Sequence, residues 1–282
     1  MHQRAETSRH GALAQLLIAW SPLSVILVAY AVAHWVNAPI GIGDGASTNR
    51  LGFPLHVVAP AEADRRVWGS IPTVWLQRQR VEEAAHWYDA AAALVYVTHF
   101  VAIPLVTAIV WFLLRDRFTA WIASVLTFTT LGVGGYVVYP AAPPWLASDM
   151  GEIGAVSRIS GLGWDYLHLE LVGRLIVLGQ EGSNPVAAMP SLHAGSALLV
   201  ALFLWPSVNS LWRAALVGYA VAMAVTLVYT GEHYVVDVVV GWLVAGVGTV
   251  VGAAMPRRSI GTRPSTTPRS TARYRERDRE AL

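Results

Sequence analysis

Residues 184–200 read NPVAAMPSLHAGSALLV, an apolar segment whose first part contains Pro190, Ser191 and His193. A histidine inside a lipid bilayer is costly and rare, so its place at the head of an apolar run needs an explanation. The residues that follow it are small or aliphatic and carry no charge. We therefore expect a membrane-embedded helix whose first turn carries polar side chains.

The composition of the whole chain is that of a membrane protein. Of the 282 residues, 55% are hydrophobic and 13% are charged, whereas a soluble domain has about 25% charged residues. Stretches near the roughly 20 apolar residues that cross a bilayer occur at 12–34, 90–114, 118–139, 191–206, 211–230 and 233–255. The sequence predicts an all-α fold, a polytopic membrane helix bundle of six transmembrane helices with interfacial helices in the outside loops.

Two long segments, about 35–89 and 140–190, are expected on the outside. The first carries Trp68 and Trp75 among charges, a pattern typical of amphipathic helices at a membrane interface. The second includes LGWDYLHLELVGRLIVLG at 162–179, which predicts a re-entrant or surface helix.

Arginines indicate the orientation, because cytoplasmic loops are enriched in basic residues. All 20 basic residues are arginine, and 13 of them fall on one side if both termini are cytoplasmic. We expect a cell-membrane protein with a cytoplasmic N-terminus at 1–11, a six-span domain at 12–255 and a disordered basic cytoplasmic tail at 256–282. The AVAH sequence at 31–34 resembles a signal-peptide cleavage site, but the apolar stretch before it is longer than a signal core, which favours an uncleaved span.

Other classes of protein are excluded by composition. The chain has no cysteine, so it contains neither a disulfide framework nor a thiolate metal site. A net charge of +2 and the lack of interleaved basic and aromatic residues argue against a nucleic-acid partner. The oligomeric state stays open.

A second polar cluster is expected at the membrane face where the 184–200 segment begins. In YTGEHYVVDVVVG, residues 229–241, His233 stands at the head of the last span and Asp237 one turn deeper. Residues i and i+4 share a helix face, so the Asp237 carboxylate is expected to accept from one ring nitrogen of His233 and leave the other free to react. An unpaired aspartate inside the bilayer would cost about 2.5–3.5 kcal/mol.

The head of the 184–200 segment suits an anion. Pro190 fits a first helical turn, Ser191 near the helix start leaves backbone N–H groups pointing outward, and His193 can donate a proton to the same anion. With His233 and Asp237 they predict a metal-free phosphoryl-transfer site that needs no cofactor. Six other histidines are interpreted as incidental: His10, His34, His56, His86, His99 and His168.

These residues resemble the motifs of the type 2 phosphatidic acid phosphatase superfamily. Its Pro-Ser-Gly-His motif is similar to residues 190–193, and its Ser-Arg-x5-His-x3-Asp motif aligns with His233 and Asp237. Thr226 and Leu227 stand where that motif has serine and arginine. The first motif, which contains lysine, is absent from this lysine-free chain.

Three segments are similar to the branch that contains inositol phosphorylceramide synthases and inositolphosphotransferases: YPAAPPW at 139–145, NPVAAMPSLH and GEHYVVD. The resemblance covers about residues 90–255 and implies that the membrane domain is catalytic. It implies that His233 attacks phosphorus, Asp237 supports it and His193 protonates the leaving group. The expected activity is a lipid phosphatase or phosphotransferase with a phosphohistidine intermediate, acting at the outer face on a phospholipid, a polyprenyl phosphate or diphosphate, or a sphingolipid-like substrate.

The missing lysine and arginine leave the phosphate ligands open. We expect Ser191, Arg158 and Arg174 to bind phosphate, with outer-segment alternatives in Arg65, Arg66, Arg78 and Arg80. The pocket is expected to be lined by Tyr139, Pro143, Pro144, Trp145, Glu232 and Tyr234, although residues 139–145 equally suit a rigid interfacial turn.

Four alternatives stay open from the sequence. The first is head-group transfer instead of hydrolysis. The second is a proton-coupled transporter that uses His193, His233 and Asp237 as a relay. The third is a metal site formed by these three residues with Glu232, and the fourth is a structural membrane scaffold.

Overall fold

The computed structural model describes residues 2–41, 45–80 and 84–256, with side chains described from residue 11 onward; the tail expected at 256–282 lies outside this range except for Pro256. Within these ranges the fold is helical, and β-structure is limited to isolated bridges. The helices are α1 (His2–Trp20), α2 (Ser24–Asn37), α3 (Val58–Trp68), α4 (Pro72–Arg78), α5 (Trp87–Leu113), α6 (Phe118–Val138), α7 (Pro144–Asp149), α8 (Gly163–Tyr166), α9 (Glu170–Glu181), α10 (Leu192–Leu204), α11 (Ser210–Tyr229) and α12 (Val235–Ala253).

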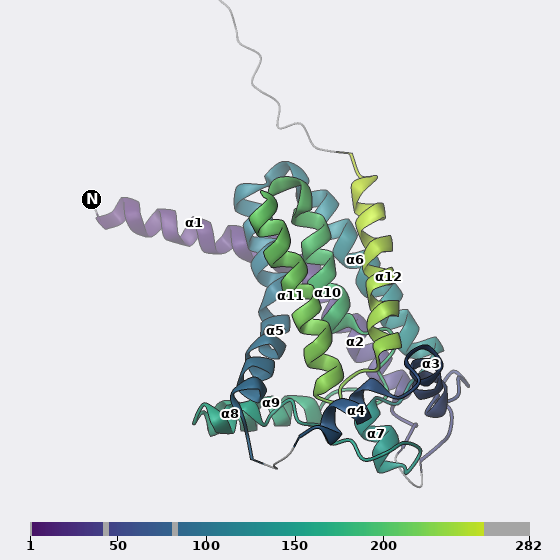
Figure 1. Cartoon of the computed structure of the whole chain (residues 1–282). Coiled ribbons are helices and arrows are strands. Elements are labelled where there is room, and N and C mark those ends of the chain that lie inside the picture. The colour runs from purple at the N-terminus through teal and green to yellow at the C-terminus, as the bar shows by residue number, and fades with distance from the viewer. Residues whose placement is uncertain (1, 42–44, 81–83, 257–282) are drawn as a thin grey trace, which may run out of the picture.

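Among the described residues, five helical segments are long and apolar enough to cross a membrane: Gly11–Asn37, Trp87–Leu113, Arg115–Val138, Ser210–Tyr229 and Val235–Ala253. A sixth apolar helix, Leu192–Ser207, is shorter. All six predicted apolar segments are therefore helical, and the chain is a polytopic helical membrane protein. The first span bends at a 3₁₀ turn, beyond which α1 projects away from the bundle (Figure 1).

The short helix α10 is the centre of the bundle and contacts α5, α6, α11 and α12 (Figure 1). Eight of its thirteen residues are buried, and they lie on all sides of the helix. A helix that is apolar all round is a buried helix, which accounts for the lack of a polar face in the sequence of α10. Its N-terminus, which carries the predicted polar residues, is held by the helices around it.

The start of α10 lies against the start of α12 with no side chain between the two backbones. The Ser191 N–H donates to the Asp237 carbonyl oxygen at 2.9 Å. A Cβ added at Gly241 would overlap the Ser191 backbone, and one added at Gly195 would lie 2.7 Å from the Gly241 carbonyl oxygen. Small residues permit this close approach, as in other membrane helix pairs.

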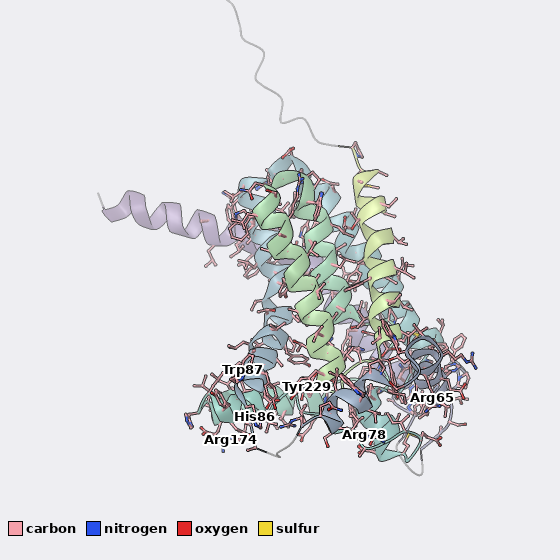
Figure 2. The ribbon with its side chains drawn as sticks, in the orientation of Figure 1. Arg65, Arg78, His86, Trp87, Arg174 and Tyr229 are labelled. Atoms are coloured by element: carbon pink, nitrogen blue, oxygen red, sulfur yellow. The ribbon has the colours of Figure 1, made fainter. Side chains whose placement is uncertain are left out.

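One end of the bundle is covered by short helices from the two long loops: α3, α4, α7, α8 and α9 (Figure 1). Four of them, α3, α4, α8 and α9, confirm the helices expected in these loops, whereas α7 falls in the proline-rich segment, where no helix was predicted. Figure 2 shows Arg65, Arg78 and Arg174 at this end. Isolated bridges join the loops to each other, since Ala141 pairs with both His56 and Ala187.

Asp64 of α3 caps the N-terminus of α12. Its two carboxylate oxygens accept from the Val235 and Val236 N–H groups, each at 2.9 Å. These are among the orphan donors of the first helical turn. Burial raises the pKa of Asp64 to about 6, against the opposing effect of the two backbone hydrogen bonds.

We predict that Gly241→Ala destabilises the fold by about 1–3 kcal/mol, the usual effect of overpacking, because the new methyl group would force α12 away from Ser191. The matched control is Gly246→Ala, on the same helix, where an added Cβ meets nothing within 4 Å. That variant should be neutral, or more stable by up to about 1 kcal/mol. Thermal unfolding in detergent compares them, and equal midpoints would contradict the close approach.

Asp64 predicts a pH dependence of stability. Because its folded-state pKa of about 6 lies above the ordinary 3.8, the folded protein keeps a proton that the unfolded chain releases. The resulting stabilisation is complete below about pH 4 and is lost as the pH rises through about 6, to a maximum of about 3 kcal/mol. Asp64→Asn lacks this titration, so its thermal midpoint relative to the parent should be higher at about pH 7.5 than at about pH 4. A pH-independent difference would refute the assignment to Asp64.

Candidate active site

The turn between α11 and α12 carries His233, and its shape depends on Gly231. Gly231 has a φ of +79°, which glycine adopts without strain, and an added Cβ would lie 2.8 Å from the Ser157 carbonyl oxygen. His233 precedes the N-cap residue Tyr234 and therefore lies outside α12. The prediction that His233 and Asp237 share a helix face was wrong in this respect, because the helix starts two residues after His233.

Capping geometry brings His233 and Asp237 together instead. The Asp237 Oδ2 atom accepts from the Tyr234 N–H at 2.9 Å and lies 3.6 Å from the His233 Nδ1 atom. The predicted pairing is therefore present as an ion-pair contact, slightly longer than a hydrogen bond. Catalytic hydrogen bonds are often long without substrate. Asp237 is fully buried and His233 is 4% exposed.

Ser191 and His193 open α10 with roles that differ in part from the prediction. Ser191 is the N-cap, and its hydroxyl oxygen accepts from the Ala194 N–H at 3.3 Å. Pro190 precedes this cap, so the prediction that it occupies the first helical turn was wrong. His193 lies in that turn, and its ring centroid is 5.8 Å from that of His233.

Three polar atoms of these residues are buried without a hydrogen-bond partner among the described residues: His193 Nδ1, His233 Nδ1 and Asp237 Oδ1. Buried polar atoms in folded proteins are nearly always paired, so a group of exceptions needs an explanation. The structure thus brings His193, His233 and Asp237 into one cluster at the loop-covered end of the bundle. Such a cluster has free capacity to bind and to move protons.

Arg158 lies next to this cluster and is held by Glu232. Its guanidinium donates to both Glu232 carboxylate oxygens at 2.9 Å, the bidentate geometry that arginine favours. Ser160 donates to the same carboxylate at 2.6 Å, and the Gln180 side-chain amide lies within 3.2 Å of it. Glu232 therefore fixes the guanidinium beside the turn that carries His233.

Arg174 is placed differently from Arg158. It is exposed on α9, and Figure 2 shows it at the edge of the loop layer. The two arginines line one cavity of about 560 Å³ together with Asp165, Glu170 and Gln180. His193, His233 and Asp237 do not line this cavity. Of these two arginines, Arg158 is the one linked to the histidine cluster, through Glu232, which precedes His233.

The proline-rich segment packs against the turn that carries His233. The Trp145 N–H donates to the Gly231 carbonyl oxygen at 3.2 Å, and the Arg158 guanidinium lies 5.3 Å from the centre of the Trp145 ring. Pro143 caps α7 and Pro144 begins it, while Tyr139 stacks on His56 at 3.8 Å. The expected turn is therefore present, whereas neither the cavity at Arg158 and Arg174 nor the apolar cleft between α5 and α11 is lined by Tyr139, Pro143, Pro144 or Trp145, so their role in a pocket stays a prediction.

Tyr234 packs away from this proline-rich segment. It is fully buried in a cluster with Ala61, Ile71, Val74 and Val156. Its position under α3 and α4 anchors the start of α12 to the first outside loop.

Sequence reasoning missed several residues that lie at the cluster. His99 and Tyr96 of α5 face the His193 ring, and Gln180 and Ser160 hold Glu232. His99 had a signal in the sequence, because an ionisable residue within a membrane span is a functional candidate by default, and its interpretation as incidental overlooked this. Gln180 and Ser160 lie in loop segments whose patterns carry no such signal.

The geometry gives no support to a metal site. Among the described residues, no group of three or more His, Cys, Asp or Glu side chains is gathered closely enough to hold an ion. Glu232, the expected fourth ligand, faces Arg158 instead.

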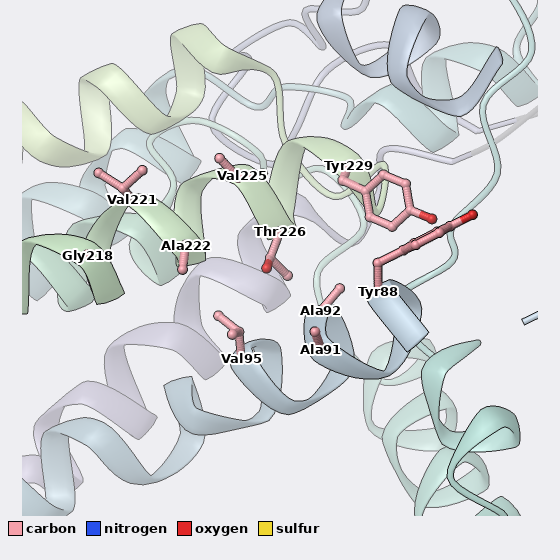
Figure 3. Close-up of a pocket in the computed structure, with 10 residues that line it drawn as sticks. All are labelled: Tyr88, Ala91, Ala92, Val95, Gly218, Val221, Ala222, Val225, Thr226 and Tyr229. Atoms are coloured by element: carbon pink, nitrogen blue, oxygen red, sulfur yellow. The ribbon is translucent and has the colours of Figure 1, made fainter. Parts of the chain in front are cut away.

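An apolar cleft of about 550 Å³ lies between α5 and α11 (Figure 3). Small and aliphatic side chains form most of its walls, and Tyr88 and Tyr229 lie close together at one end. The Tyr229 hydroxyl donates to Asp89 at 2.5 Å, which ties the end of α11 to the start of α5. None of His193, His233 and Asp237 lines this cleft.

Comparison with known proteins finds a matching family and related sequences. The profile of the PAP2 superfamily matches residues 62–251. The chain is 31% identical over 170 residues to phosphoinositol dihydroceramide synthase of Bacteroides thetaiotaomicron, covering 55% of this chain and 53% of that protein. It is 30% identical over 154 residues to the inositol phosphorylceramide synthase catalytic subunit aur1 of Schizosaccharomyces pombe, covering 53% and 36%. The chain thus spans about half or less of these relatives, and no solved structure gives a significant match.

We predict that Glu232→Ala lowers the free energy of unfolding by about 1–3 kcal/mol, because it leaves the Arg158 charge and the Ser160 hydroxyl without their acceptor. Glu152→Ala, at an exposed position in the same loop layer, is the control and should match the parent. Arg158→Lys, which keeps the charge but loses the fork geometry, should fall between them. A Glu232→Ala midpoint equal to that of the control would disprove this role.

Proposed function

The chain belongs to the PAP2 superfamily, and we propose that it is an integral-membrane lipid phosphatase or phosphotransferase whose catalytic domain extends over residues 12–255. The observation that carries this proposal is the cluster of His193, His233 and Asp237, with three buried polar atoms left unpaired. Buried polar atoms with a packing role are normally paired, whereas two histidines and a carboxylate with free atoms can accept, donate and transfer protons during phosphoryl transfer. The relatives named above are synthases, so transfer to an acceptor alcohol is as well supported as hydrolysis.

The first chemical step is attack on phosphorus by a ring nitrogen of His233. The N–P bond forms as the P–O bond to the leaving group breaks, and His193 gives a proton to the departing oxygen. Reacting atoms lie about 3 Å apart in such steps. The two rings, with centroids 5.8 Å apart, are close enough for both to contact one phosphoryl group.

The second step reverses these roles at a phosphohistidine intermediate. Water or an acceptor hydroxyl attacks phosphorus, His193 takes its proton, and the N–P bond breaks. Asp237, 3.6 Å from His233 Nδ1, stabilises the positive charge that His233 carries in the intermediate. Covalent catalysis divides one difficult displacement into two easier ones, and no step requires a metal or a cofactor.

The negative charge of the transferred group needs a partner, since such stabilisation is a large term in catalysis. We assign this role to Arg158 and to the N-terminus of α10 at Ser191. The equivalent end of α12 is less suited, because Asp64 already accepts from its Val235 and Val236 N–H groups. Arg174 is exposed, and we assign it only to the approach of the anionic head group.

We place the site at the outer face of the cell membrane, with both termini cytoplasmic. The support is the distribution of arginine, because 13 of the 20 arginines lie at the termini and in the short turns on the opposite side. Such an excess of basic residues is typical of the cytoplasmic side. The substrate class follows as a phospholipid, a polyprenyl phosphate or diphosphate, or a sphingolipid-like molecule presented from the bilayer. The transport alternative would use the same ionisable residues, and the experiment below separates the two.

The test measures inorganic phosphate release and acceptor-dependent head-group transfer by the purified protein in chelator, with phosphatidic acid, phosphatidylinositol plus ceramide, and a polyprenyl diphosphate. We expect turnover of at least one substrate and loss by at least 10³-fold in His233→Ala. A labelled phosphoryl enzyme should be trapped in the parent and not in His233→Ala.

The matched control is His168→Asn, which replaces an exposed histidine with positive φ by a residue that tolerates this conformation. It should keep parental turnover. Turnover that His233→Ala retains would refute the proposed nucleophile. Absence of turnover on every substrate, with proton-coupled uptake in vesicles, would favour transport.

A further inference from the structure

Two rings of α5 enclose the His193 imidazole. The Tyr96 ring lies 5.3 Å from it, centre to centre, and is nearly parallel at 20°. The His99 ring lies closer, at 3.9 Å and 35°. Tyr96 and His99 are three residues apart, so they project from neighbouring positions on one face of α5.

The His99 ring is itself fixed against α10. Its Nδ1 atom lies 3.2 Å from the Ser196 hydroxyl oxygen, and that hydroxyl donates to the His193 carbonyl oxygen at 2.9 Å. A serine hydroxyl has a single proton, so its oxygen accepts from His99, and this assigns the proton of neutral His99 to Nδ1. His99 is thus linked to His193 in two ways. Their rings are in contact, and Ser196 bridges the His99 ring to the His193 backbone.

Tyr96 is fixed from the loop side. The Gln180 side-chain amide donates to the Tyr96 hydroxyl at 3.2 Å and to the Ser160 hydroxyl at 2.8 Å. The same amide lies 3.2 Å from Glu232, the residue that holds Arg158. One network therefore links the ring beside His193 to the guanidinium beside the catalytic turn.

His193 needs such support because no carboxylate orients it. Its Nδ1 atom is buried with no hydrogen-bond partner among the described residues, whereas His233 has Asp237 at 3.6 Å. The direction in which His193 offers its proton is then set by the packing of the ring. A misplacement of about 1 Å can reduce a rate by about 100-fold.

We propose that His99 and Tyr96 are positioning residues that hold the His193 imidazole in the orientation from which it protonates the leaving group. This inference rests on the proposed function, in which His193 is the acid. It makes the second membrane span, α5, part of the catalytic machinery, although none of the sequence motifs lies in it.

The role predicts a dependence on the leaving group. An alkyl leaving group must be protonated as it departs, whereas a nitrophenolate is a stable anion and departs without the acid. The experiment measures the single-turnover rate of leaving-group release, and the substrate concentration that half-saturates it, for the alkyl ester and the nitrophenyl ester of the phosphoryl group that the parent turns over. Single-turnover release reports the first step alone, whereas kcat also includes the second step, in which His193 is the base. The variants are His193→Ala, His99→Ala, His99→Phe, Tyr96→Ala and Tyr96→Phe.

We expect His99→Ala and Tyr96→Ala to lower the single-turnover rate for the alkyl ester by about 10- to 100-fold, within the range that acid catalysis contributes, with the half-saturating concentration changed little. Their single-turnover rate for the nitrophenyl ester should change by less than about 3-fold, as for His193→Ala. Ring-preserving His99→Phe and Tyr96→Phe should recover most of the loss. The His99→Ala/His193→Ala double variant should be no worse than His193→Ala, because the two residues act as a unit.

Equal losses on both esters, additive losses in the double variant, or parental activity in His99→Ala would each overturn the positioning role. If His99→Ala fails to fold, His99→Phe still tests the proposal. A Phe variant as impaired as His193→Ala would contradict positioning of His193 by the packing of a ring at residue 99. The proposed function fails separately, if His193→Ala itself shows no dependence on the leaving group. His168→Asn serves again as the control.

Discussion

The hydrogen bond from the Ser191 N–H to the Asp237 carbonyl oxygen joins the starts of α10 and α12, and the candidate site depends on it. His193 lies two residues after Ser191, and the Asp237 side chain both caps α12 and faces His233. Two backbones can approach this closely only because Gly241 has no side chain. The positions of His193, His233 and Asp237 are therefore consequences of one helix contact.

The loop layer supplies the second constraint, because the turn that carries His233 is outside any helix. Asp64 binds the first amides of α12, Trp145 binds the Gly231 carbonyl, and Glu232 is locked to Arg158. Each contact comes from a different loop segment. A site built in this way keeps its geometry, because the irregular backbone of the turn finds its hydrogen-bond partners within the protein.

The six apolar segments and the three central site residues could be predicted, since each depends on local pattern. The length of an apolar stretch predicts a membrane span directly. The contact between His233 and Asp237 was predicted from their spacing, and it is present although the helix starts later than expected. The partner of Arg158 could not be predicted, because Glu232 is distant in sequence and either residue alone suits several roles. His99 was interpreted as incidental for the same reason, since its place at the candidate site depends on its contact with the His193 ring.

The sequence by itself determined that this chain is a helical membrane protein with His193, His233 and Asp237 at one end of its bundle. Hydrophobicity and motif spacing are properties of short stretches, and they survive without knowledge of the packing. Only the tertiary structure decided that α10 is the central helix and that Tyr96 and His99 enclose the His193 ring. The physical reason is that ring contacts and bidentate ion pairs form between residues far apart in the chain, whose meeting depends on how the helices pack.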